Sequence, residues 1–81
     1  MKARVFVSLK KTVLDPQGQT IQSALAGRGY SSIAHVRQGK LFEIELSPET
    51  DRDSAHKDLE EIAREVLANP VIEEFRVELL D

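Results

Sequence analysis

The side chains of this sequence that could carry out chemistry are two histidines, a group of carboxylates and a few cations. His35 lies in an extended segment and His56 early in a helical one. Neither has a serine, aspartate or second histidine at the spacing of a catalytic triad or a metal site. Because the chain contains no cysteine, thiol nucleophiles, thiolate-bound metals and disulfides are excluded. We therefore interpret both histidines as structural or surface residues.

A group of carboxylates in the second half of the chain could suggest a metal site. It consists of Asp51, Asp53, Asp58, Glu60, Glu61 and Glu65. Arg52, Lys57 and Arg64 are interspersed among them, a pattern typical of a solvated helix face with i,i+4 ion pairs. We interpret the group as such a face.

The segment Gly27-Arg28-Gly29 contains a G-x-G motif. A dinucleotide-binding fingerprint needs a third glycine and a strand before its helix, whereas these glycines follow a helical pattern. They are instead typical of a helix C-terminus, where glycine adopts the left-handed cap conformation without a Cβ clash.

Four cations and one loop remain as candidates for a binding surface. The cations are Lys10, Lys11, Arg37 and Lys40. Lysines at strand ends also protect a sheet edge from pairing with another strand. The four cations can therefore be interpreted either as a basic binding patch or as protection of the sheet edge. The loop runs from Lys11 to Gly18, and its proline and glycine alone indicate no more than entry into a helix.

Length and composition limit the function classes. A chain of 81 residues is a single domain (1–81) with a modest core, which favours self-association. The net charge of −3 argues against a nucleic-acid partner. The sequence has neither an apolar run of about 20 residues nor a basic-then-apolar N-terminus. We expect a cytoplasmic protein without membrane contact.

Periodicity predicts strands at both ends of the chain and two helices between them. Apolar and polar residues alternate over 3–10 and over 75–79. The first helix starts at Asp15-Pro16, with Asp15 as N-cap, and ends at Gly27-Arg28-Gly29. Its apolar residues are Ile21, Ala24 and Leu25, with Leu14 one turn earlier.

The second helix has Ser47 and Thr50 among its possible caps, and Asn69-Pro70 stops it. Its apolar stripe contains Ala55, Leu59, Ile62, Ala63, Val66 and Leu67. The order β-α-β(β)-α-β predicts an α+β fold with the helices on one face of an antiparallel sheet.

The middle segment, residues 33–46, is extended and has two interpretations. Ala34, Val36, Phe42, Ile44 and Leu46 share one parity, so a single long strand could bury them together. A hairpin turning at Gln38-Gly39 would instead group residues 33 and 35 with 42 and 44. Because the parity is unbroken, we favour the long strand, with room for a bend near Gly39.

Four short pieces carry a family resemblance. They are Leu9-Lys10, Val13-Leu14-Asp15-Pro16-Gln17-Gly18, Val36-Arg37-Gln38-Gly39-Lys40 and Leu67-Ala68-Asn69-Pro70-Val71-Ile72-Glu73. In their order and spacing, over essentially the whole chain, the sequence resembles PurS, the small-subunit family of phosphoribosylformylglycinamidine synthase in purine biosynthesis.

The resemblance implies a ferredoxin-like, two-layer α/β sandwich that works as a homodimer or a dimer of dimers. It implies two partners, the synthetase subunit PurL and the glutaminase subunit PurQ. The complex makes formylglycinamidine ribonucleotide from formylglycinamide ribonucleotide, glutamine and ATP. We expect this chain to supply no catalytic residue, metal site or cofactor site, and ATP and Mg²⁺ to bind the synthetase subunit. Its implied role is to join the other two subunits and to aid ammonia transfer.

We expect contacts with these partners at Asp15, Pro16, Gln17, Gly18, Arg37 and Lys40. We expect the homo-oligomer to be symmetric and built through strand edges, from the final strand or the long middle strand. The alternative function is a free-standing ferredoxin-like module that binds a ligand or regulates another protein.

Overall fold

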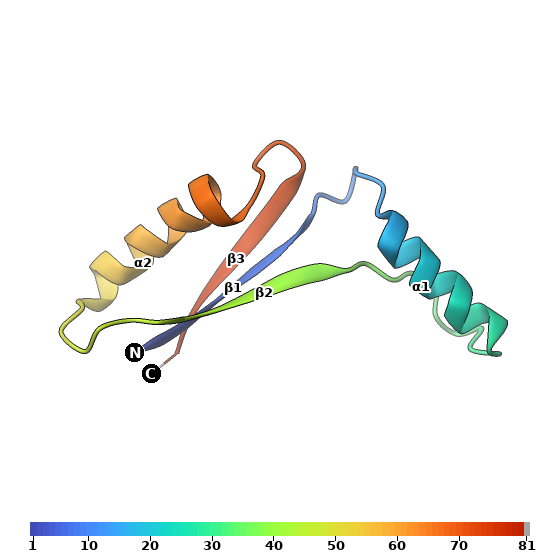
Figure 1. Ribbon diagram of the computed structural model, residues 1–81, viewed down its shortest axis with the longest axis horizontal. Coiled ribbons are helices and arrows are strands. Elements are labelled where there is room, and N and C mark those ends of the chain that lie inside the picture. The colour runs from blue at the N-terminus through green and yellow to red at the C-terminus, as the bar shows by residue number, and fades with distance from the viewer. Residues whose placement is uncertain (81) are drawn as a thin grey trace.

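The computed structural model describes residues 1–80, which form three strands, two α-helices and a short π-helical segment (Figure 1). In chain order these are β1 (Lys2–Leu9), α1 (Pro16–Gly27), β2 (Gly39–Glu45), α2 (Arg52–Ile62), η1 (Ala63–Leu67) and β3 (Glu73–Leu80). The predicted α+β class and the order β-α-β-α-β are confirmed. No helix within residues 1–80 is both long and apolar enough to cross a membrane.

The sheet has the strand order β2-β1-β3, and both pairs are antiparallel. Val5 of the central strand lies opposite Phe42 on one side and Val77 on the other. Val5 and Val7 are almost fully buried, and they pack with Ala63 and half-buried neighbours to form the core. Strand alternation therefore directs one face of the sheet towards α2 and η1.

The first helix begins and ends where the sequence predicted. The Oδ1 atom of Asp15 accepts a hydrogen bond from the Gly18 backbone N–H at 3.0 Å, and Pro16 is the first helical residue. At the other end, Gly29 has a φ of 92°, a left-handed conformation that glycine adopts without strain.

The cap of α2, which the sequence left open with Ser47 and Thr50 among the possibilities, is neither of these two residues. The hydroxyl groups of these two residues lie 3.0 Å apart and bond each other. Asp51 caps the helix instead, because it directly precedes Arg52 and its Oδ2 atom accepts from the Ser54 N–H at 3.1 Å.

The middle segment forms a shorter strand than predicted. Residues 39–45 pair with β1, whereas residues 33–38 run without strand pairing and do not fold back as a hairpin. The reason lies in the partner strand. Ser8 pairs with Gly39 and β1 ends at Leu9, so no strand within residues 1–80 lies beside residues 33–38.

The first helix does not lie over the sheet. Figure 1 shows α2 across one face of the sheet and α1 beyond its end. The expectation that both helices cover one face is therefore wrong for α1 within one chain. Leu14 and Ile21 are 64% and 39% exposed as a result. The radius of gyration is 16.1 Å, against about 12 Å for a compact chain of this length.

Candidate functional site

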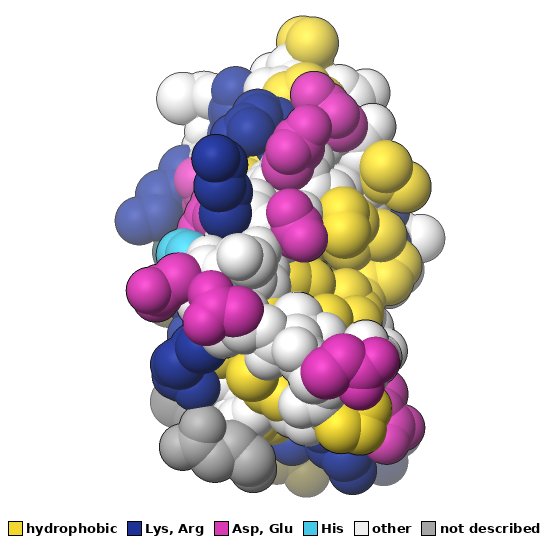
Figure 2. All heavy atoms as spheres, turned by 90° about the vertical axis from the view of Figure 1, so that its left-hand side faces the viewer, with side chains coloured by type: hydrophobic (Ala, Val, Ile, Leu, Met, Phe, Trp, Pro, Cys, Tyr) yellow, Lys and Arg dark blue, Asp and Glu magenta, His cyan; other side chains and the backbone are white. Residues whose placement is uncertain are grey.

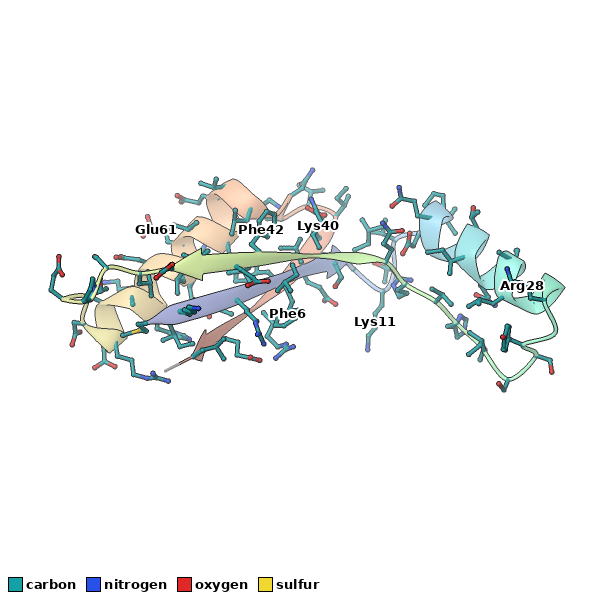
Figure 3. The ribbon with its side chains drawn as sticks, turned by 60° about the horizontal axis from the view of Figure 1, so that its bottom comes forward. Phe6, Lys11, Arg28, Lys40, Phe42 and Glu61 are labelled. Atoms are coloured by element: carbon teal, nitrogen blue, oxygen red, sulfur yellow. The ribbon has the colours of Figure 1, made fainter. Side chains whose placement is uncertain are left out.

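The six residues expected to contact partners gather where the chain leaves the sheet and returns to it. Two adjoining hollows mark this joint: one of about 470 Å³ includes Asp15 and Arg37, and one of about 330 Å³ includes Asp15, Gln17 and Lys40. We call residues 16–38, which contain α1 and the returning segment, the arm. Figure 3 shows Lys11 and Lys40 near the joint and Arg28 far out on the arm.

Asp15 is the centre of this joint and is 6% exposed. Its Oδ1 atom accepts from the Gly18 N–H at 3.0 Å and its Oδ2 atom from the Gln38 N–H at 2.7 Å. The hydrogen bond from Gly18, followed by that from Gln38 and the charge of Arg37, lowers the pKa of Asp15, and burial only partly opposes this. The carboxylate thus connects the start of α1 to the end of the returning segment.

Gly18 lets the two halves of the arm touch. A Cβ atom on Gly18 would overlap the carbonyl oxygen of Val36 and would lie 2.8 Å from Asp15 Oδ2. A residue without a side chain permits such a close approach by another backbone. In the structure, the backbone that approaches belongs to the same chain.

Arg37 closes the loop that leads out of β1. Its Nη2 atom donates to the carbonyl oxygens of Lys10 and Val13, each at 2.9 Å. The loop is also held from the other side, because the Lys10 N–H donates to the Ile72 carbonyl at 2.9 Å. We call this joint (Lys10, Val13, Asp15, Gly18, Val36, Arg37 and Gln38) the elbow.

The other three candidate residues remain accessible. Pro16 and Gln17 are exposed on the first turn of α1. The Lys40 ammonium group lies 3.6 Å from Glu73, and the lysine side chain is 58% exposed. The site thus divides into two buried residues, Asp15 and Gly18, an exposed Arg37 that is bonded to the backbone of the loop, and an outward set, Pro16, Gln17 and Lys40.

Sequence reasoning missed Val36, Gln38 and Glu73. Val36 and Gln38 act through a backbone carbonyl and a backbone N–H, which leave no trace in residue type. The contact of Glu73 with Lys40 joins two strands that are far apart in sequence. Within residues 1–80 no three histidine or acidic side chains gather in a way that could hold a metal ion. The geometry is that of a structural joint with an accessible rim.

Comparison with known proteins gives consistent matches along the chain. The family model described as PurS, phosphoribosylformylglycinamidine (FGAM) synthase, matches residues 2–81. The PurS subunit of this synthase from Mycobacterium leprae is 46% identical over 76 residues, covering 94% of this chain and 91% of that protein. The Bacillus subtilis PurS subunit is 42% identical over 78 residues, covering 96% and 90%.

Solved structures agree in fold as well as in sequence. A C2 crystal form of B. subtilis PurS has a TM-score of 0.81 at 40% identity, covering 99% of this chain and 98% of the other. A chain in the structure of PurLQS from Thermotoga maritima has a TM-score of 0.86 at 30% identity, covering 98% and 95%. The likeness therefore includes both the arm and the sheet.

Proposed function

Since the chain belongs to the PurS family, we propose that it is the small, non-catalytic assembly subunit of phosphoribosylformylglycinamidine synthase in purine biosynthesis. The observation that carries this proposal is the full-length match to a chain of the T. maritima PurLQS structure. The name PurLQS denotes PurL, PurQ and PurS together.

The proposed complex converts formylglycinamide ribonucleotide, glutamine, ATP and water to formylglycinamidine ribonucleotide, glutamate, ADP and phosphate. Its glutaminase releases ammonia, which the synthetase consumes. A third subunit that holds the two in a fixed arrangement raises the effective concentration of one site at the other. This chain positions the other two subunits relative to each other, and we expect ATP and Mg²⁺ to bind the synthetase subunit.

The polar groups of the elbow support a role in assembly. The Asp15 carboxylate and the Arg37 guanidinium bond to the backbone of this chain, which leaves them poorly placed to act on a substrate. The absence of cysteine excludes the thiol nucleophile that a papain-like glutaminase needs. The geometry of Asp15 and Arg37 fits a joint that gives the arm a fixed direction.

The accessible rim of the elbow is the proposed surface for the larger subunits. Pro16, Gln17, Thr20, Ile21 and Gln38 line a shallow hollow of about 360 Å³ at the base of α1. Lys40 lines an adjoining hollow together with Gln17 and Gln38, and its exposed ammonium group suits an acidic partner residue. Arg37 contributes by holding the loop beneath this rim.

We further propose that the protein is a symmetric homodimer, or a dimer of dimers, in the cytoplasm. Two features support self-association. Leu14 and Ile21, at and within the start of α1, are exposed, and the outer edge of β2 has no strand beside it among residues 1–80.

Gel filtration of the purified chain with the purified glutaminase and synthetase subunits tests the assembly proposal. We expect the three proteins to elute together, and Lys40→Glu to weaken this association. Lys57→Glu makes the same charge change on the exposed face of α2, away from the elbow, and serves as the control. Separate elution of the wild-type chain would contradict the proposal. Thermal stabilisation by a small metabolite with no protein partner would then favour a free-standing binding module.

A further inference from the structure

The turn between η1 and β3 presents apolar side chains to solvent. It lies at the end of the sheet where β1 leads into the elbow (Figure 1). We call residues 69–73 the knuckle. Val71 is 77% exposed and Ile72 is 40% exposed, and Pro70 is exposed beside them. Figure 2 keeps the vertical axis of Figure 1, and hydrophobic atoms form the crest of the molecule there, at the height of this turn.

The knuckle is held rigid by its own hydrogen bonds. The Asn69 carbonyl oxygen accepts from the Ile72 N–H at 3.1 Å and from the Glu73 N–H at 2.7 Å. The Asn69 side chain accepts from the Val71 N–H at 3.1 Å, and the Glu73 carboxylate accepts from the Asn69 N–H at 2.7 Å. Pro70 has no N–H and a fixed φ. Because the turn is ordered before any partner arrives, covering it costs little conformational entropy.

Two contacts attach the knuckle to the elbow and its rim. The Ile72 carbonyl oxygen accepts from the Lys10 N–H at 2.9 Å, and the Glu73 carboxylate lies 3.6 Å from the Lys40 ammonium group. The hollow of about 330 Å³ that Gln17 and Lys40 line also includes Glu73. The knuckle therefore continues the accessible rim of the elbow, which is the proposed surface for the larger subunits.

We propose that the knuckle is the apolar anchor of that surface and inserts into an apolar socket, bordered by carboxylates, on one of the two larger subunits. This inference rests on the assembly role proposed above and adds the anchoring residues and the chemistry of the partner. Specific protein interfaces combine a small apolar centre with a polar rim. Val71 and Ile72 supply the centre here, and Gln17 and Lys40 belong to the rim.

The charges beside the knuckle favour an acidic border on the partner. The elbow end of the sheet carries four cations, Lys10, Lys11, Arg37 and Lys40. The acids next to the knuckle in the chain do not offset them. The Glu73 side chain is only 14% exposed and is already bonded, and Glu74 points to the sheet face opposite α2. Arg64 and Glu65 of η1 carry opposite charges, so the surroundings of the knuckle are basic on the elbow side.

The shape of the knuckle makes a second copy of this chain a poor occupant. The knuckle protrudes, and its apolar surface consists of residues 70–72 alone. Two copies meeting knuckle to knuckle would bury far less than the roughly 800 Å² per partner of a stable interface. Insertion of the knuckle into a hollow elsewhere on a second copy would be a heterologous contact, which repeats into an open filament unless it closes into a ring. A different protein with a matching socket meets neither difficulty.

Two substitutions of Val71 test the inference. Val71→Glu and Val71→Lys place long side chains of opposite charge at the same exposed position, so both variants should fold like the wild type. Circular dichroism and urea denaturation verify the fold. The affinity of each variant for the purified glutaminase and synthetase subunits, alone and together, would then be measured by titration. Leu41→Glu is the matched control, because it replaces an exposed apolar side chain on the sheet face opposite α2, where Glu43 already lies.

We expect Val71→Glu to weaken binding to a larger subunit at least tenfold and Val71→Lys to weaken it less, because carboxylates of the socket repel the first and attract the second. Leu41→Glu should bind like the wild type. Wild-type affinity of Val71→Glu for both subunits would overturn the inference and leave the assembly role standing. Equal weakening by the two Val71 substitutions would overturn the proposed acidic socket. Failure of the wild-type chain to bind either subunit would contradict the assembly role together with the anchor.

Discussion

Gly18 in α1 lies so close to the carbonyl oxygen of Val36 that a Cβ atom at position 18 would overlap it. This contact joins the outgoing helix to the returning segment and makes the arm a single unit. The elbow around it determines the direction of α1 relative to the sheet. The predictions below test the elbow one contact at a time.

Gly18→Ala should destabilise the protein by about 1–3 kcal/mol, because the added methyl group meets backbone that cannot move aside easily. Gly27→Ala is the matched control in the same helix, since nothing lies within 4 Å of its added Cβ. That change should be neutral or stabilise by up to roughly 1 kcal/mol. Urea denaturation measures both, and equal midpoints for the two variants would show that the close contact is absent.

Asp15→Asn should reveal a pH-dependent contribution of the carboxylate to stability. Because folding lowers the pKa of Asp15 below its ordinary value of 3.8, the ionised group stabilises the fold above that value. The contribution is lost as the pH falls through the lowered folded pKa. The difference in unfolding free energy between wild type and variant should therefore be largest near neutral pH and should shrink below pH 3.8. A difference that stays constant from pH 7 downwards would show that the Asp15 charge contributes nothing.

Arg37→Ala should lower the free energy of unfolding by about 1 kcal/mol, since two carbonyl oxygens lose a charged donor and regain only water. Lys11→Ala removes an exposed cation from the same loop and should have little effect. Hydrogen exchange should also accelerate in residues 10–13 of the Arg37 variant. Unchanged exchange in this loop would indicate that Arg37 does not hold it.

Lys40 and Glu73 should be coupled only weakly. The ammonium and carboxylate groups are 3.6 Å apart and the lysine is largely exposed, so a double-mutant cycle should give roughly 0.2–1 kcal/mol. Salt should reduce this coupling further. If the fold depends so little on Lys40, loss of binding to the larger subunits in Lys40→Ala, which places no second carboxylate beside Glu73, reflects the interface. A coupling well above this range would instead assign Lys40 to the fold.

Local signals in the sequence predicted the ends of α1 and the final strand. Asp15 and Pro16 act within one helical turn, and Phe75 alternates with its neighbours along one strand. Such features depend on residues that are adjacent in the chain. The cap of α2 was not identified because serine, threonine and aspartate are all good N-caps. In the structure the Ser47 and Thr50 hydroxyl groups bond each other, and Asp51 accepts the hydrogen bond from the helix.

The placement of α1 could not be predicted from the chain alone. Its apolar residues show that one face needs cover, but periodicity does not say which surface supplies that cover. Residues 33–38 have strand parity, yet pairing requires a neighbouring strand, and β1 ends at Leu9. The elbow was only partly predictable, because Val36 and Gln38 take part through their backbone atoms.

The most direct test of the assembly role compares nitrogen sources in a reconstituted reaction. The glutaminase and synthetase subunits would be assayed with and without this chain, using either glutamine or ammonium chloride. Omitting the chain should reduce glutamine-dependent turnover by roughly tenfold or more, because ammonia is no longer delivered between fixed sites. Turnover with ammonium chloride should stay unchanged. Equal glutamine-dependent rates with and without the chain would contradict its role as the assembly subunit.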